Sequence, residues 1–400
     1  MPNIQPGILK WAREKAGLSQ AEAARKLDLK DGRRGAGSEQ ITALEEGMAQ
    51  VTRPLLLKMV KVYRRPLLTF YLKEPPREGE RGQDFRNLPD RDPASDALVD
   101  AVLRDVKARQ SMVRSMLEES DDPPSMPFIG SCRIEDGVDT VVASIRRTVG
   151  FDLTEFRSQD TPDAAFALLR SKVEAMGIFV LLIGNLGSHH SAIPVKAFRG
   201  FALADKIAPF IVINDQDAKA AWSFTLLHEL AHLWIGASGV SGGRAESQTE
   251  KFCNDVASMT LLPPAELSQL EIRREAGEDE ILGRIGEFAS DRLLSRRLVA
   301  YRLFRSGVIS EATWNRIVER IEVDNQRRRV PQREAKEKKG GPNFYVVRRH
   351  RLGTALLRVV AENLQEGSLT PTKASRVLGI KPRQVPVLLG TGGLTSRPAA

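Results

Sequence analysis

Residues 221–236 read AWSFTLLHELAHLWIG and contain the pattern H-E-x-x-H at His228, Glu229 and His232. Residues four positions apart share one face of an α-helix, so both imidazoles can bind the same metal ion. Apolar residues at helical spacing surround the motif, and Gly236 is typical of a helix end. A random chain of this composition would contain the pattern about 0.005 times. The motif therefore predicts a zinc site on a helix, and the alternative is a buried helix whose histidines only satisfy hydrogen bonds.

The segment that follows offers a third ligand. A catalytic zinc site has three protein ligands and one open position. Residues 245–263 read as a second helix that stops at Pro263. Glu246 and Glu250 are four positions apart in this helix, so they lie on one face. The residues by themselves leave these two glutamates nearly equal as ligands.

The two segments together resemble the ImmA/IrrE family of metallopeptidases. In that family the H-E-x-x-H helix is followed by a motif E-x-x-A-N-x-F-A-A-x-x-L-M-P, whose glutamate is the third zinc ligand. Residues 250–263 read EKFCNDVASMTLLP and differ from this motif at Cys253, Val256 and Ser258. The resemblance implies that Glu250 is the third ligand.

The expected chemistry is hydrolysis of a peptide bond by a gluzincin-like zinc endopeptidase. Zn²⁺ held by His228, His232 and Glu250 polarises the scissile carbonyl and acidifies a water molecule. Glu229 is not a ligand; it takes the proton of that water and returns it to the leaving amine. Two residues one turn after the third ligand are candidates for orienting a ligand by a hydrogen bond: Asn254 and Asp255.

Three short apolar runs before the motif predict a small sheet, at residues 177–184, 198–205 and 208–214. An edge strand near the metal helix can bind a substrate chain through backbone hydrogen bonds. The strand Gly200–Leu203 or its neighbour is the candidate, and the alternative is a sheet that only covers the helix pair. Helices are expected at 94–119, 138–148, 162–175 and 292–304. The predicted fold class is mainly α with a small β-sheet (α+β), with a zincin-like metallopeptidase domain.

The composition of the chain indicates the cellular compartment in which the protein is expected. Four hundred residues with 42% hydrophobic content are enough for two or three domains with their own cores. No stretch approaches the roughly 18 uninterrupted apolar residues of a membrane span, and the first residues lack the apolar segment of a signal peptide. The two cysteines, Cys132 and Cys253, have no metal or redox spacing. We therefore expect a cytoplasmic protein with no membrane partner.

The net charge of +9 is unevenly distributed. Residues 1–74 contain 14 Lys and Arg against 8 Asp and Glu, a net +6, and residues 325–400 contain 16 against 4, a net +12. The middle of the chain is therefore −9. Basic ends favour contact with nucleic acid, although a charged tract is more often a solvated face.

The N-terminal segment reads as four short helices. The first covers residues 8–16 and ends at Gly17, and Ser19 caps the second. Ser38 is expected to cap the third helix, and Pro54 to open the fourth. The segment therefore predicts a small helical domain.

This pattern resembles the XRE, or phage-repressor, type of helix-turn-helix, through LSQAEAA at 18–24 and LEEG at 44–47. In that family the helix after the turn enters the major groove of DNA. The alternative is a protein-docking or dimerisation role for the same fold, because a fold does not fix function. The resemblance implies that base or backbone contacts come from four residues and phosphate contacts from two arginines: Gln20, Ser38, Gln40 and Thr42, with Arg33 and Arg34.

The C-terminal segment carries a partial repeat. Residues 369–380 read LTPTKASRVLGI and repeat the pattern of LSQAEAARKLDL at 18–29. We interpret the repeat as a second helix-turn-helix-like unit, and an ordinary capped helix is the alternative.

The chain thus divides into six expected segments. The motifs EPP at 74–76 and DFR at 84–86 also resemble ImmA/IrrE proteins with a repressor-like domain, so the resemblance covers about residues 8–320. The segments are an XRE-like domain (1–73), a linker (74–93), a zinc peptidase domain (94–270), a helical extension (271–325), a charged tract without fixed structure (326–342) and a basic C-terminal domain (343–400).

The resemblance also implies a biological role. ImmA/IrrE proteins cleave helix-turn-helix repressors and thereby release stress or mobile-element genes. The resemblance implies a regulatory zinc endopeptidase with a repressor as protein substrate and DNA as a partner of its N-terminal domain. The sequence leaves undecided whether the chain forms a homodimer. The alternative is a transcription regulator whose metal site is sensory or structural. Glu229 favours the peptidase, because a structural site has no use for that carboxylate.

Overall fold

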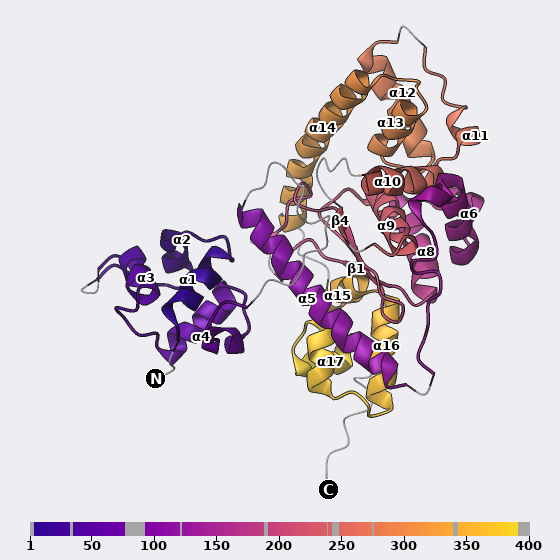
Figure 1. The fold of residues 1–400 in the computed structure, drawn as a ribbon. Helices are drawn as coiled ribbons and strands as arrows, with labels where there is room; N and C mark the ends of the chain where they lie inside the picture. The colour runs from indigo at the N-terminus through magenta and orange to yellow at the C-terminus, as the bar shows by residue number, and fades with distance from the viewer. Residues whose placement is uncertain are drawn as a thin grey trace. The chain divides into compact units, whose positions relative to one another are not determined.

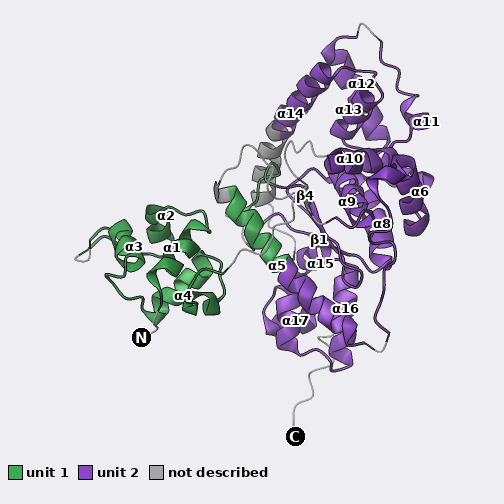
Figure 2. Cartoon of the chain, viewed as in Figure 1, with its two compact units in different colours: residues 1–106, 185–197 green, residues 107–184, 198–400 purple. Residues whose placement is uncertain are grey.

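The computed structural model of the chain describes residues 4–32, 35–76, 93–120, 122–187, 191–237, 239–241, 248–273, 276–338 and 343–390. The fold is mainly helical with one small sheet, which confirms the predicted class (Figure 1). The chain forms two compact units, one of residues 1–106 and 185–197 and the other of residues 107–184 and 198–400 (Figure 2).

Four helices in the first unit confirm the helical N-terminal domain. They enclose a core that includes Ile8, Leu27, Ile41 and Leu56, all nearly inaccessible to solvent. The elements are α1 (Pro6–Glu14), α2 (Gln20–Lys26), α3 (Gly37–Glu45), α4 (Arg53–Val62) and the 3₁₀ helix η1 (Leu67–Tyr71).

The helix caps agree with the sequence at α2 and differ at α3. Ser19 caps α2, because its hydroxyl accepts a hydrogen bond from the backbone of Glu22. The expected cap at Ser38 is wrong, since α3 begins before it, at Gly37. Asp31 accepts a hydrogen bond from the Gly37 amide at 2.8 Å, so a side chain from the preceding loop replaces the serine.

A four-stranded sheet lies in the second unit, in the order β1-β3-β2-β4. β1 (Phe179–Leu182) pairs parallel with β3 (Phe210–Ile213), and β2 (Gly200–Leu203) is antiparallel to β3 and to β4 (Gly239–Ser241). The three predicted strands are confirmed. β2 is paired on both sides and is therefore not an edge strand; its neighbour β4 is the outer one. Three residues of β4 are too short for a hydrophobic pattern to reveal.

Helices pack around this sheet and form one continuous core. The helix that carries the H-E-x-x-H motif, α9 (Lys219–Trp234), packs on β2 and β3 and also against α10 (Gln248–Leu261). Further helices agree with the predictions for 94–119, 138–148 and 162–175. They are α5 (Pro93–Glu118), α6 (Val138–Val149) and α8 (Pro162–Ala175), accompanied by η3 (Ile134–Asp136), α7 (Leu153–Arg157) and α11 (Pro264–Leu267).

Two predictions after the sheet need correction. The helix expected at 292–304 is present as α13 (Arg296–Arg305), but it starts four residues later than predicted. The preceding helix α12 (Glu278–Asp291) ends in a turn with φ +58° at Leu293. Ser295 caps α13 and so fixes its start. The tract at 326–342 is not without structure, because α14 (Glu311–Lys338) continues through most of it. Arg, Lys, Glu and Gln dominate this tract, and all have high helix propensity.

The C-terminal helices belong to the second unit. α15 (Phe344–Leu352) and α16 (Thr354–Gln365) pack against β1, and α16 also contacts α8. Thr370 caps α17 (Pro371–Leu378), followed by η5 (Pro382–Gln384) and α18 (Val385–Leu389). The second helix-turn-helix-like unit stays a prediction. Within the described ranges no helix is long and apolar enough to cross a membrane.

Candidate metal centre

α9 positions its three motif residues deep inside the second unit. Glu229 and His232 have no exposed surface, and His228 is 3% exposed. The helix ends at Trp234 and is followed by Gly236, which has φ +68°, a conformation that glycine adopts without steric penalty. The sequence prediction of a glycine-terminated helix is therefore confirmed.

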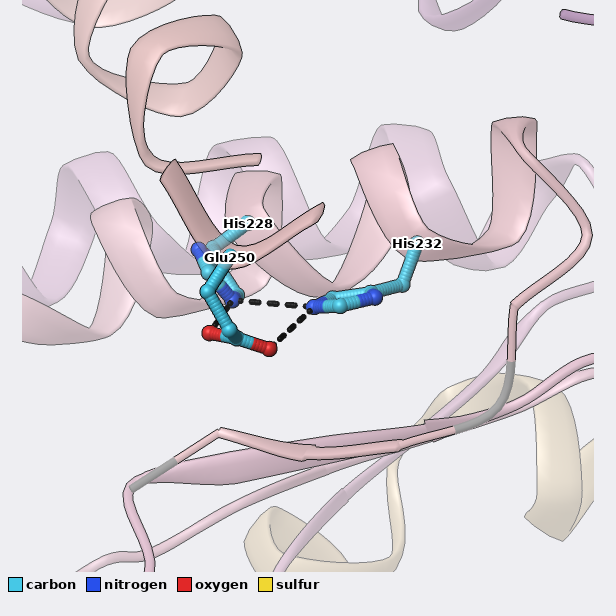
Figure 3. A group of neighbouring side chains, drawn as sticks. All are labelled: His228, His232 and Glu250. Carbon is cyan, nitrogen blue, oxygen red and sulfur yellow. Dashed lines mark hydrogen bonds and ion pairs between the residues drawn. The ribbon is translucent and has the colours of Figure 1, made fainter. Parts of the chain in front are cut away.

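α10 brings a carboxylate to the two imidazoles (Figure 3). The Nε2 atoms of His228 and His232 lie 3.1 Å apart. The Glu250 carboxylate lies 3.3 Å from Nε2 of His228 and 3.1 Å from Nε2 of His232. The ligand atoms of this trio all lie within 4.8 Å of one another, so one ion can contact all three. Glu246, the rival ligand, lies outside the described residues.

The electrostatics of the trio suit a cation. Burial raises the pKa of Glu250, but hydrogen bonds with His228 and His232 outweigh burial and place that pKa below its usual range. A buried carboxylate that stays ionised beside two imidazole nitrogens is the N,N,O donor set of a zinc site with an open position. The Nδ1 atoms of both histidines are buried and have no hydrogen-bond partner within the described part of the chain.

Comparison with known proteins agrees with this geometry. Residues 185–304 match the family model of the IrrE N-terminal-like domain, Peptidase_M78. This segment of the chain is therefore similar to a domain of a metallopeptidase family. The histidine–glutamate trio lies inside the matched segment. The match does not include the N-terminal helices. Neither the curated proteins nor the solved structures contain a match to this chain.

Asp255, which lies in the matched segment, makes contacts that the sequence did not predict. Its carboxylate accepts hydrogen bonds from the Tyr301 hydroxyl at 2.8 Å and from Arg305 at 2.8 and 2.5 Å. These bonds join α10 to α13. No local pattern reveals Tyr301 and Arg305, because they lie about 50 residues further along the chain. Asn254 is half-buried, and the ligand-orienting role expected of Asn254 or Asp255 stays a prediction.

Four of the six DNA-binding candidates lie on α2 and α3. The Gln40 side chain donates to the carbonyl oxygens of Lys30 and Gly35, at 2.9 and 3.2 Å. It therefore holds the loop that precedes α3. Gln20 donates to Glu45, and Thr42 to the Ser38 carbonyl oxygen. All four candidates are half-buried, and DNA contact stays a prediction for each: Gln20, Ser38, Gln40 and Thr42. Arg33 and Arg34 lie outside the described residues.

Proposed function

We propose that the chain is a regulatory zinc-dependent endopeptidase that cleaves a helix-turn-helix repressor in the cytoplasm. The observation that carries this proposal is the convergence of His228, His232 and Glu250 in an IrrE-like domain, on the helix that also carries Glu229.

The residues have distinct roles in the proposed reaction. His228, His232 and Glu250 would hold the ion, and zinc, when bound, supplies a Lewis acid that polarises a peptide carbonyl and acidifies water. Glu229 would not hold the ion. It would carry the proton from the attacking water to the leaving amine nitrogen. Because Glu229 is fully buried, its carboxylate acts where few water molecules compete for that proton.

The regulatory part of the proposal rests on the first unit. Its four helices, with a Ser19-capped α2 followed by α3, are compatible with the XRE-like resemblance. A peptidase that carries a repressor-like domain in the same chain would recognise DNA through it and act on a repressor. We propose DNA and a helix-turn-helix repressor as the two macromolecular partners.

Substitution of Glu229 by glutamine tests the proposal. The full chain is incubated with the repressor encoded beside its gene, with and without zinc, and cleavage is followed by mass spectrometry. Glu229→Gln keeps the shape of the side chain but cannot take a proton, so turnover should fall about 100-fold or more while bound zinc is unchanged. Glu287→Gln is the matched control, since Glu287 is exposed on α12.

The alternative is a metal-sensing transcription regulator with negligible turnover. It would be supported if wild type and Glu229→Gln left the repressor intact while both bound the same operator. Equal cleavage by wild type and Glu229→Gln would instead remove Glu229 from the reaction.

A further inference from the structure

One glycine of the sheet lies against the Glu229 carboxylate. Gly200 is the first residue of β2 and pairs with Ile213 of β3 and Ser241 of β4. A Cβ atom at position 200 would lie 2.7 Å from Oε1 of Glu229, and real Cβ atoms essentially never come within 3.0 Å of such an atom. No side chain therefore fits at this position while Glu229 keeps its conformation.

We propose that Gly200 is a positioning residue for Glu229: its missing side chain is the space that the carboxylate occupies. The catalytic consequence rests on the proposed function, whereas the steric relation between positions 200 and 229 does not. The sequence indicated Gly200 as part of a predicted strand and candidate substrate-binding edge, but nothing local indicates which residue of α9 faces it.

Two other groups surround the same space and define the competing explanation. The Cβ atom would also lie 2.7 Å from Cγ2 of Thr225 and 3.0 Å from the carbonyl oxygen of Val212. Gly200 could thus serve only the close packing of α9 on β2. The Val212 carbonyl belongs to the β3 backbone, and Thr225 is β-branched, with its hydroxyl bonded to the Ala221 carbonyl oxygen at 3.2 Å. Glu229 has the longer side chain and more rotatable bonds, so it would move first.

The size of the movement indicates the effect on catalysis. Relief of the contact with Glu229 alone requires a shift of about 0.7 Å of its Oε1 atom, from 2.7 Å to ordinary contact at 3.4 Å. A misplacement of about 1 Å at a reacting group lowers a rate up to about 100-fold. Displacement of Glu229 should lower kcat and leave KM and zinc binding unchanged, because Glu229 is proposed to carry a proton and not to hold the ion or the substrate.

The first experiment is Gly200→Ala in the full chain. We expect kcat for repressor cleavage to fall at least about 10-fold, with KM and zinc stoichiometry within about two-fold of wild type. Gly283→Ala is the matched control: Gly283 lies in α12, and a Cβ atom there meets nothing within 4 Å. Unchanged kcat in Gly200→Ala would overturn the proposal.

The second experiment uses thermal unfolding, which needs no catalytic activity. Gly200→Ala is measured in wild type, in Glu229→Ala and in Thr225→Ser, which removes Cγ2 but keeps the hydroxyl. We expect Gly200→Ala to lower Tm in wild type and in Thr225→Ser, and to lower it much less in Glu229→Ala. If Gly200→Ala alone is insoluble, recovery of soluble protein by Glu229→Ala but not by Thr225→Ser gives the same answer.

The opposite pattern would overturn the proposal. Recovery of Tm and of kcat by Thr225→Ser, with no recovery of Tm by Glu229→Ala, would make Gly200 a residue of helix–sheet packing only. If wild type cleaves no repressor, the proposed function fails, while the unfolding measurements still decide whether positions 200 and 229 are coupled.

Discussion

His228, His232 and Glu250 show how single residues acquire a function through burial. Two imidazole nitrogens 3.1 Å apart, beside an ionised carboxylate, concentrate lone pairs among side chains that are almost completely buried. A divalent cation accepts these lone pairs and neutralises the buried carboxylate. The trio is therefore expected to bind zinc with the three residues acting together.

Removal of one ligand should abolish stoichiometric metal. His228→Ala leaves two ligands, so we expect the purified variant to contain far less than one zinc per chain when measured by plasma mass spectrometry. Glu287→Gln should keep the full metal content. A His228→Ala protein that retained one zinc per chain would disprove the ligand assignment.

A buried ion pair in the first unit gives a second prediction for single residues. Arg13 on α1 donates to both carboxylate oxygens of Glu45 on α3, at 2.6 and 3.0 Å, and the hydrogen bond with Glu45 raises the pKa of Arg13. Glu45→Ala removes the bidentate carboxylate partner of a buried guanidinium, which then keeps the exposed Glu14 carboxylate at 3.7 Å. This loss should destabilise the four-helix domain by about 3–5 kcal/mol. Hydrogen exchange of residues 6–62 in the full chain measures this loss.

The adjacent glutamate provides the control for this measurement. Glu46→Ala removes an exposed carboxylate, so we expect a change within about 0.5 kcal/mol. Equal exchange in the Glu45→Ala and Glu46→Ala variants would show that the Arg13–Glu45 pair does not stabilise the domain.

In the second unit, a side chain of one helix caps another helix that is distant in sequence. α16 has no side-chain cap of its own, because Gly353 precedes it. Glu174 of α8 takes this role: its carboxylate accepts from the Thr354 amide at 2.8 Å and from Arg170 at 2.9 Å. Arg170 also donates to the His350 carbonyl oxygen at 2.6 Å. The C-terminal helices are thus fixed to the sheet by a helix almost two hundred residues earlier.

Removal of this cap should release the C-terminal helices. Glu174→Ala leaves the first amides of α16 and the buried Arg170 without their acceptor, so we expect a loss of about 3–5 kcal/mol in local stability. Hydrogen exchange should accelerate in residues 344–378. Glu362→Ala, on the exposed face of α16, should leave this exchange unchanged; equal protection in the two variants would contradict the capping role.

The whole molecule combines charges of opposite sign in different segments. Residues 1–74 carry a net +6, whereas residues 75–324 carry −9. A basic helical domain binds DNA through phosphates, and each phosphate contact releases counterions. DNA binding by this chain should therefore depend on salt concentration.

Salt dependence tests the proposed DNA contact. We expect operator affinity to fall steeply between about 50 and 200 mM salt, and the joint variant Arg33→Ala/Arg34→Ala to reduce the logarithmic slope by about 2, one unit for each phosphate contact. Fluorescence anisotropy with a labelled duplex measures both quantities. Glu229→Gln should bind like wild type, and the absence of binding at low salt would favour protein docking by this domain.

The sequence by itself determined the fold class, the first-unit helices, three strands and the motif helix. These features depend on local chemistry: a repeat of apolar residues, a capping side chain or a glycine at a helix end. The H-E-x-x-H spacing likewise placed two histidines on one face, because helix geometry is fixed over four residues.

Only the tertiary structure decided what faces the motif helix. It placed Glu250 beside both imidazoles and showed that β2 is an internal strand. It also showed that Asp255 accepts hydrogen bonds from Tyr301 and Arg305, and that Gly200 lies against Glu229. Contacts of this kind join residues about 20 to 50 positions apart, so they depend on how helices and strands pack, which no local pattern records. The high charge of residues 326–342 led to the wrong expectation of a tract without structure, whereas their helix propensity agrees with α14. No local pattern predicted the Asp31 cap of α3.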